Sequence, residues 1–452
     1  MTNDHTATTT RAPVRIAHLG LGAFHRAHQA WYTHVANGAS DEQWGIEAFS
    51  GRRTELVDAL REQDFRYTLI VRDSDGESAT RIDSIVAAAY GDDGARWRDV
   101  IADPAVALLT MTITEAGYAL DVAVECDKNA LVADDGAAMV TAPGRIVDGL
   151  RARSRAHAGP FAIVSCDNLP RNGVVTHDVV VSLAAQVDRG LAEWIERNVS
   201  FVSSVVDRIT PGATPDDSST ALALAGHSDA IPVVTEPFSE WILSGEFPAG
   251  RPHWESGGAR FVDNIEAFEN RKLWLLNGAH SLLAYVGTLR GHDTVDEAMN
   301  DEWCRERVEQ LWAEARDVIE LNESELDAAV EALRARFANS SIRHLLLQIA
   351  ADGSQKLPSR IVEVQRRRLA AGLPIGAAGA LAIAAWLTHL RDHPEWVSDV
   401  RASGLHDQLI HSDGGAQVEL ILDLIAPDKS HGLSTAVSEA LAELAPHRKD
   451  PS

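Results

Sequence analysis

The chain has 452 residues, 45% of them hydrophobic, which is enough for two or three domains with sizeable buried cores. Aspartates and glutamates number 66 against 41 lysines and arginines, so the formal net charge is −25 with neutral histidine. This negative charge repels polyanions, so we expect neither nucleic acid nor an anionic membrane surface as a partner. Few of the cations are lysines: Lys128, Lys272, Lys356, Lys429 and Lys449. A lysine in a candidate site therefore needs a reason why arginine would not serve.

The cysteines and the apolar stretches indicate the cellular compartment in which we expect the protein. Three widely separated cysteines (Cys126, Cys166 and Cys304) form neither a disulfide framework nor a CxxC pattern, so we expect a reducing, cytoplasmic environment. The start MTNDHTATTTRAP is polar and predicts a flexible tail without a signal peptide. The Ala-rich stretch 375–387 is about thirteen residues long, short of the roughly 20 that a membrane span needs. We expect it to be a buried core helix.

Short β-branched runs alternate with helical patterns over about the first 210 residues. We expect strands at 14–19, 45–49, 67–71, 107–113, 161–165 and 201–205. Helical spacing of apolar residues predicts helices at 52–63, 146–155 and 178–197. This alternation favours an α/β fold whose doubly wound parallel sheet is covered on both faces.

Long helical patterns with few strand signals follow from about residue 265. They lie at 267–289, 302–318, 323–337 and 360–371 and predict a mostly α-helical domain. The Gly/Pro-rich segment 246–258 is the candidate connection between the two halves. We therefore expect a nucleotide-binding domain at 1–264 and a helical domain at 265–452.

A glycine pair directly after the first expected strand predicts a phosphate-binding loop. Gly20 and Gly22 form a GxG, which lets the chain turn tightly and brings backbone N–H groups toward a pyrophosphate at a helix N-terminus. His25 stands where the third glycine of the dinucleotide fingerprint would fall, so the motif is incomplete. A plain strand-to-helix turn is the alternative, but the strand, helix and second strand around the pair favour a dinucleotide.

The residues after the second expected strand bear on the choice of cofactor. NAD enzymes usually carry an acidic residue here for the ribose hydroxyls, whereas this chain has Arg52 and Arg53 before Glu55. We expect NAD, with NADP open as the alternative. The other interpretation places both arginines on a solvated helical turn.

His25 and His28 stand three residues apart, a spacing that raises the question of a metal ion. Two histidines without a partnered carboxylate or cysteine are a weak ligand set, so we expect no metal here. We favour a helix N-terminal role for His25.

A second motif, ENRKLWLLNGAHS at 269–281, lies in a strong helical pattern. On an α-helix with about 100° per residue, Asn277 and His280 fall about 140° and 80° from Lys272, so the three can share a broad face. Apolar residues surround the lysine. It either extends its amine to water or is a desolvated amine with a lowered pKa that acts as a base.

A third segment, SCDNLPRNG at 165–173, follows an expected sheet strand. Ligands of doubly wound sheets bind at the carboxyl ends of strands, so the Asn168 amide can reach a substrate oxygen. A lysine base, amides that stabilise an alkoxide and a histidine that orients a hydroxyl suit alcohol oxidation without a metal, with hydride passing to a nicotinamide.

Together these segments resemble the long-chain mannitol dehydrogenase family of polyol and hexuronate dehydrogenases. The resembling pieces are HLGLGAFHRAHQ (18–29), LTMTITEAGY (109–118), SCDNLPRNG (165–173), VVDRITP (205–211), EPFSEW (236–241), KLWLLNGAHS (272–281) and ADGSQKLPSR (351–360). The resemblance implies a Rossmann-type N-terminal domain, a helical C-terminal domain and an active site in the cleft between them.

The resemblance also implies roles for individual residues. Lys272 matches the family's general base, and Asn168 and Asn277 match its oxyanion-stabilising pair. His280 and Lys356 match ligands of substrate hydroxyls, and Glu269 matches a carboxylate that gates proton release. The cofactor-binding residues that we expect are Gly20, Gly22, Ala23, Phe24, His25, Arg26, Arg52, Thr114 and Glu115.

Departures from the family pattern leave the substrate open. The acidic positions often found after the EPF motif are altered or displaced at 241–246, and Gln348 stands where mannitol 2-dehydrogenases can carry an arginine. We expect oxidation of an acyclic polyol, with mannitol and fructose as the leading pair and arabinitol as another candidate. Reduction of fructuronate to mannonate is the alternative, with Arg360 as the candidate cation for a carboxylate.

The sequence also bears on two further classes of function. A nucleotide-binding sensor that has lost turnover would lack the lysine or the amides, and all of them are present. A phosphosugar dehydrogenase would need extra cations, which the acidic charge argues against. We expect a small-molecule substrate and a monomer or small homo-oligomer.

Overall fold

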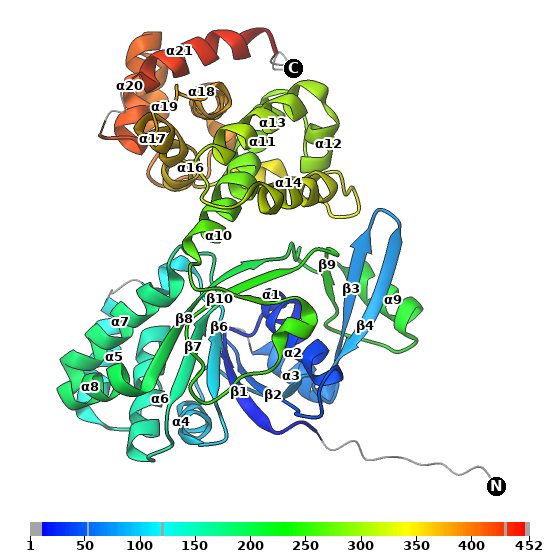
Figure 1. Cartoon of the computed structure of the whole chain (residues 1–452), viewed down its shortest axis with the longest axis vertical. Coiled ribbons are helices and arrows are strands. Elements are labelled where there is room, and N and C mark those ends of the chain that lie inside the picture. The colour runs from blue at the N-terminus through cyan, green and yellow to red at the C-terminus, as the bar shows by residue number, and fades with distance from the viewer. Residues whose placement is uncertain (1–10, 52–53, 119–121, 429–431, 448–452) are drawn as a thin grey trace. The chain divides into compact units, whose positions relative to one another are not determined.

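The computed structural model describes residues 11–51, 54–118, 122–428 and 432–447 (Figure 1). The chain forms two compact units, Met1–Ile265 and Glu266–Ser452.

The first unit is built on an eight-stranded sheet in the order β11-β10-β8-β7-β6-β1-β2-β5. Its strands are β1 (Val14–Leu19), β2 (Gly45–Phe49), β5 (Ile85–Ala89), β6 (Leu108–Met111), β7 (Phe161–Ser165), β8 (Val199–Asp207), β10 (Glu240–Ser244) and β11 (Arg260–Phe261). Strands β5, β2, β1, β6, β7 and β8 are parallel, and β10 pairs antiparallel with β8. The parallel part has the strand order of a Rossmann fold, with its switch point between β1 and β6.

Helices cover both faces of this sheet (Figure 1). Along β1, Ile16 packs into one hydrophobic cluster and its neighbour Ala17 into the other, as the alternation of side chains in a strand requires. One face carries α1 (Ala23–Ala27), α2 (Gln29–Gly38) and α3 (Glu55–Glu62). The other carries α4 (Gly94–Ala102), α5 (Val122–Ala133), α6 (Ala142–Arg155), α7 (Asn172–Val187) and α8 (Arg189–Asn198). The α/β class predicted from the sequence is confirmed.

Several details of this unit differ from the sequence-based expectations, and strand β5 was not expected. The strand expected at 67–71 is β3 (Tyr67–Asp73), which belongs to a second sheet with β4 (Gly76–Ile82) and β9 (Val233–Thr235) beside helix α9 (Pro215–Ala225). The helix expected at 178–197 is two helices, because Asp188 ends α7 and caps α8 by accepting the Gly190 N–H at 2.7 Å.

The segment 246–258 is not a connection between the halves but part of the first unit. Its 3₁₀ turn η2 (Trp254–Gly257) places the Trp254 side chain in the core, where the indole packs 4.4 Å from that of Trp241 and donates to the Thr33 hydroxyl at 3.1 Å. A fully buried tryptophan anchors this segment, despite its glycines and prolines.

The second unit is helical; its described residues contain no strand beyond an isolated bridge between Thr294 and Leu345. The longer helices are α11 (Gly278–Leu289), α13 (Glu302–Arg316), α14 (Glu323–Phe337), α17 (Glu363–Ala370), α18 (Ala377–Asp392), α20 (Gly414–Ile425) and α21 (Leu433–Leu444). Shorter ones are α10 (Glu266–Arg271), α12 (Val295–Asn300), α15 (Leu346–Ala350), α16 (Gly353–Leu357) and α19 (Leu405–Ile410). The mostly helical domain predicted from the sequence is confirmed.

Helices α11 and α18 form the core of this unit. Every residue of α11 is buried, and so is nearly all of α18. The expectation of a core helix for the Ala-rich stretch is thus confirmed. Of the helices that the structure describes, none has the length and apolarity needed to cross a bilayer.

Candidate functional site

The loop after β1 lies at the switch point of the sheet and can hold a dinucleotide. Gly20 has φ +105°, and a Cβ there would lie 2.0 Å from the Thr112 carbonyl oxygen, just after β6. Thr112 also donates its hydroxyl to the Gly20 carbonyl at 2.8 Å and its N–H to that of Leu19 at 2.9 Å. Only glycine fits at position 20, because both the backbone angle and the neighbouring strand exclude a side chain.

Gly22 opens the helix that follows. A Cβ there would meet only the Gly20 carbonyl oxygen, at 3.6 Å, so the space beside this glycine is free. Helix α1 then begins at Ala23 and has only five residues, because His28 leaves helical backbone angles before α2 starts. The structure therefore has two short helices after the loop, with Ala23 and Phe24 half-buried in the first.

His25 lies in the interior of the unit, beneath this loop. Its ring stacks on that of His18 at 3.3 Å, and its Nδ1 lies 3.4 Å from the Gln29 side-chain oxygen. Burial and the adjacent His18 hold the pKa of His25 well below its usual range. Both ring nitrogens of His28 form hydrogen bonds with protein groups, one with the Gln29 amide and the other with the Glu240 carbonyl. The two histidines thus serve a buried polar network.

The remaining residues that we expect to bind the cofactor differ in burial and in the part of the unit where they lie. Arg26 is buried, donates to the Ile231 carbonyl and lies over the Tyr67 ring at 5.3 Å, so its guanidinium is engaged inside the unit. Thr114 is exposed after β6, and Glu115 begins the 3₁₀ turn η1 (Glu115–Tyr118). Arg52 and the side chain of Glu115 lie outside the described part of the chain.

Asn168 lies in the loop between β7 and α7 and is exposed. Its neighbour Asp167 is buried, as is Asn172 at the start of α7. The amide of Asn168 thus lies at the carboxyl end of a parallel strand, the edge at which such sheets bind ligands.

The lysine motif in the second unit adopts a conformation that the sequence did not predict. Lys272–Asn277 is a π-helical segment, η3, between α10 and α11. In a π-helix the hydrogen bonds join residues five apart. Lys272 and Asn277 are therefore about one turn apart and lie on the same side of the helix. The α-helical angle of about 140° between these two residues therefore does not apply, although the expectation that they can share a face still stands. Lys272 and Asn277 are half-buried, whereas His280, in α11, is only 7% exposed.

A second π-helical segment, η4 (Pro358–Val362), packs against the first. The Trp274 indole donates to the Ser359 carbonyl at 3.1 Å. Arg360 donates to the Ser281 hydroxyl at 3.2 Å and approaches the Asn277 carbonyl at 3.4 Å. The structure thus brings the KLWLLNGAHS and DGSQKLPSR pieces together in one place.

His280 is a neutral imidazole in a cationic environment. Its ring lies 4.8 Å from those of Phe337 and His344, and its Nε2 is buried without a hydrogen-bond partner. Burial, followed by the nearby His344 and the cations Arg336, Arg360 and Lys272, holds the pKa of His280 well below its usual range. An imidazole with an open nitrogen suits a hydrogen bond with a substrate hydroxyl.

Lys356 and Arg360 lie close to each other in this unit. Lys356 donates to the Ile349 carbonyl at 3.2 Å, and burial together with Arg360 lowers the pKa of its amine. Burial lowers the pKa of Arg360 to about 10. Glu269, one turn before Lys272, is half-buried.

No pattern in the sequence points to His344 and Arg336, which the structure places near His280. His344 comes from the loop between α14 and α15, and no spacing pattern links it to the lysine motif. Its Nδ1, like the His280 Nε2, is buried without a partner. Only the folded unit identifies these two residues as neighbours of the motif.

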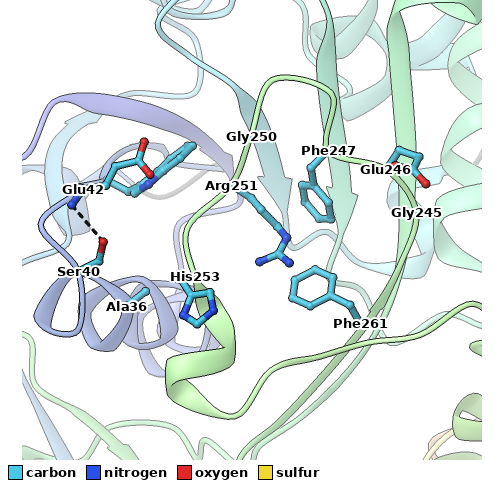
Figure 2. Close-up of a pocket in the computed structure, with 11 residues that line it drawn as sticks. Ala36, Ser40, Glu42, Gly245, Glu246, Phe247, Gly250, Arg251, His253 and Phe261 are labelled. Atoms are coloured by element: carbon cyan, nitrogen blue, oxygen red, sulfur yellow. Dashed lines mark hydrogen bonds between the residues drawn. The ribbon is translucent and has the colours of Figure 1, made fainter.

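A separate pocket of about 630 Å³ lies in the first unit (Figure 2). Trp44, directly before β2, and Gly245, directly after the antiparallel strand β10, are among its lining residues. Figure 2 shows Arg251 extending toward Phe247 and Phe261, and its guanidinium lies 3.5 Å from the centre of the Phe261 ring. This pocket is at the amino-end edge of the parallel strands, opposite the edge that carries Gly20 and Asn168.

One group of described residues, His292, Asp301 and Cys304, has its potential ligand atoms within 4.8 Å of one another. The Asp301 carboxylate is already occupied by Arg290, which donates at 2.7 Å, and by His292 at 2.9 Å. A guanidinium at this distance competes with a metal ion, so the cluster is better explained as a structural ion pair.

Comparison with known proteins covers both units. Residues 14–256 match the mannitol dehydrogenase Rossmann domain, and residues 264–418 match the mannitol dehydrogenase C-terminal domain. D-mannonate oxidoreductase of Escherichia coli strain K12 is 37% identical over 82% of this chain and 80% of its own. Mannitol 2-dehydrogenase of Cereibacter sphaeroides is 35% identical over 79% of this chain and 77% of its own.

A solved structure of a relative is also similar to this chain. The mannitol 2-dehydrogenase of Pseudomonas fluorescens, in a ternary complex with NAD and D-mannitol, is 31% identical and has a TM-score of 0.76 over 97% of this chain and 92% of its own. The resemblance found in the sequence motifs is thus confirmed at the level of both units. The chain belongs to the mannitol dehydrogenase family of oxidoreductases.

Proposed function

We propose that this protein is an NAD-dependent dehydrogenase that oxidises a secondary alcohol of an acyclic polyol, with D-mannitol and D-fructose as the leading pair. The observation that carries the proposal is the π-helical turn that aligns Lys272 with Asn277 and leads into the buried, neutral His280. The relative from Pseudomonas fluorescens binds NAD and D-mannitol and is 31% identical, which supports this choice of cofactor and substrate.

The loop after β1 fits the proposed cofactor. Gly20 is required by the backbone of the neighbouring strand end, and the space beside Gly22 is open where a Cβ would be. This opening allows the close approach of a pyrophosphate to the backbone N–H groups at the start of α1. A nicotinamide held by this loop would supply the acceptor for the hydride that leaves the substrate carbon.

The protein's own residues handle the proton and the oxygen. The unprotonated Lys272 amine removes the hydroxyl proton, and the amide N–H groups of Asn168 and Asn277 stabilise the oxygen as its negative charge develops. His280 and Lys356 bind neighbouring hydroxyls of the substrate. Glu269 passes the proton from Lys272 to solvent. These steps need no metal ion, because a lysine base and amide donors supply both functions.

Reduction of a hexuronate such as fructuronate to mannonate is the second candidate. Arg360 favours it: the hydrogen bonds of its guanidinium go to a backbone carbonyl and a hydroxyl, so its charge remains available for a substrate carboxylate. The E. coli D-mannonate oxidoreductase, 37% identical, supports this alternative. An arabinitol substrate is a third candidate, since a D-arabinitol 4-dehydrogenase of Ralstonia nicotianae is 34% identical.

The deciding experiment assays the purified protein with mannitol, arabinitol and mannonate, each with NAD and with NADP. We expect turnover of mannitol with NAD, and we expect Lys272→Ala to lower it by roughly 10²- to 10⁴-fold without loss of NADH binding. Lys128→Ala is the matched control, since Lys128 pairs with Glu125 on α5. Full activity of Lys272→Ala would remove the proposed base.

Arg360→Met separates the two substrate classes. If the substrate is a sugar acid, this variant loses far more kcat/KM with mannonate than with mannitol. Equal losses on both substrates would assign Arg360 to the support of Asn277 and Ser281 alone. A cytoplasmic location and a monomeric or small oligomeric state stay predictions.

A further inference from the structure

Asp167, directly before Asn168, is a buried carboxyl group that ties two loops together. It is 6% exposed. One carboxyl oxygen accepts the backbone N–H of Ile113, and the other accepts the hydroxyl of Tyr118. Ile113 and Tyr118 flank Thr114 and Glu115, the residues after β6 that are proposed to contact the cofactor. The side chain of Asp167 therefore joins the proposed cofactor loop to the loop that carries Asn168.

The other side of the Asn168 loop is fixed by Asn172. Its amide donates to the Asp167 carbonyl at 3.0 Å and to the Ser204 carbonyl at 2.8 Å, and its oxygen accepts the Ser204 N–H at 2.9 Å. Asn172 thereby holds the loop against β8, while Asp167 holds it against the segment after β6. Asn168 lies between these two anchors and is exposed, as are Pro170 and Arg171.

The partners of Asp167 are themselves held in place. The Thr176 hydroxyl, on α7, lies 3.3 Å from the Tyr118 oxygen and 2.7 Å from the Ser165 hydroxyl at the end of β7. Burial raises the pKa of Asp167 to about 7 and raises that of Tyr118. A buried carboxyl group with neutral hydrogen-bond donors costs stability when it ionises, so this arrangement is not explained by stability alone.

We propose that Asp167 is a positioning residue, which holds the Asn168 amide at a fixed place relative to the cofactor loop at 112–118. This inference rests on the proposed function, because it takes Asn168 as a donor to the reacting oxygen. Misplacement of a catalytic group by about 1 Å can lower a rate by roughly 100-fold. We expect the Asn168 amide to move if the carboxyl of Asp167 no longer accepts both hydrogen bonds.

The test compares Asp167→Asn, Asn168→Ala and the double variant with the wild type. We expect Asp167→Asn to lower kcat by roughly 10- to 100-fold, with little change in the NADH Kd measured by fluorescence titration. If Asp167 acts through Asn168, the double variant is no slower than Asn168→Ala alone. Asp127→Asn is the matched control, because this buried carboxylate also accepts backbone N–H groups and a hydroxyl, from Val140 and Thr141.

The outcomes separate the inference from the function on which it rests. If Asn168→Ala leaves kcat unchanged, the proposed role of Asn168 fails, and the role of Asp167 fails with it. If Asn168→Ala is slow but Asp167→Asn is as fast as wild type, only the inference on Asp167 is wrong. Additive losses in the double variant, or an equal loss in Asp127→Asn, would likewise contradict the positioning role. Tyr118→Phe, which removes one of the two bonds, should give a smaller loss of kcat with the same unchanged NADH Kd.

Discussion

The indole of Trp274 donates a hydrogen bond to the backbone carbonyl of Ser359, and this bond joins the two π-helical segments of the second unit at 3.1 Å. A second indole, that of Trp312, donates to the Leu275 carbonyl at 2.9 Å within the first segment. π-Helical turns are rare, and they occur frequently at functional sites. Buried tryptophans that bind the backbone at such turns hold the proposed base and its neighbours in this unusual conformation.

Removal of the first of these bonds should affect both stability and turnover. Trp274→Phe leaves the Ser359 carbonyl without this donor, and the loss of one partly buried hydrogen bond costs about 0.5–1.5 kcal/mol. We expect a lower urea midpoint and a several-fold lower kcat, because η3 and η4 carry Lys272 and Arg360. Trp303→Phe is the matched control, since the Trp303 indole nitrogen has no hydrogen-bond partner to lose. Equal effects of the two substitutions would contradict a specific role for the bond.

The lysine motif shows what the sequence could and could not predict at the site. The residue types and their order were enough to select Lys272, Asn277 and His280, and to predict a helix around them. The apolar pattern of KLWLLN is compatible with α- and π-helical turns alike, so the sequence does not distinguish between them. The contacts that favour the π form come from Trp312 and Ser359, which lie far along the chain. Such contacts are visible only in the folded unit.

In the first unit, too, the sequence predicted some elements of the fold and not others. The parallel strands β1, β2, β6, β7 and β8 are short, apolar and separated by helices, so their periodicity was sufficient to predict them, whereas the sequence pattern did not predict β5. Strand β4 (GESATRI) is mostly exposed and polar, and it pairs with β3 through a turn at Asp73–Gly76. The Asp75-Gly76 pair is typical of a β-hairpin. The alternation of strands and helices in the surrounding sequence favoured parallel strands instead, so this hairpin was not predicted. The burial of Trp254 was likewise not predicted, because the glycines and prolines around it are typical of a linker.

Gly20 and Gly22 should respond differently to alanine. Gly20→Ala must place a Cβ against the Thr112 carbonyl and keep a left-handed backbone, so we expect a loss of stability of at least about 1–3 kcal/mol. Gly22→Ala has room and an extended backbone, so the fold should survive while the new methyl group occupies space proposed for the pyrophosphate. We expect the urea midpoint to fall only for Gly20→Ala, and the NADH Kd to rise about tenfold, or 1.4 kcal/mol, for Gly22→Ala. Tight NADH binding by Gly22→Ala would contradict the proposed position of the cofactor.

Buried histidines should make the protein sensitive to acid. Burial lowers the pKa of His18 to about 3 and that of His389 to about 4, so the folded chain keeps them neutral where the unfolded chain protonates them. Stability is therefore retained above pH 6.5 and falls as the pH drops from there toward 4. At pH 5 one such histidine accounts for at most about 2 kcal/mol. The free energy of unfolding from urea titrations at pH 7.5, 6 and 5 measures this loss.

His389→Gln should flatten that pH dependence, because glutamine does not titrate. His411→Gln is the control in the same unit, since His411 is exposed. A wild-type free energy of unfolding that is the same at pH 7.5 and pH 5 would show that these imidazoles are not held neutral in the folded state.

The pH dependence of the reaction should report Lys272 and not His280. The pKa of His280 is held well below its usual range by burial and by the nearby His344 and cations, so we expect a neutral imidazole near pH 7. Polyol oxidation should slow toward low pH as the Lys272 amine becomes protonated. We expect His280→Asn to lower kcat/KM for the polyol but to leave the midpoint of this acidic limb where it is in the wild type. A shift or disappearance of the limb in His280→Asn would instead assign the titrating group to His280, and would contradict a neutral imidazole that only binds a substrate hydroxyl.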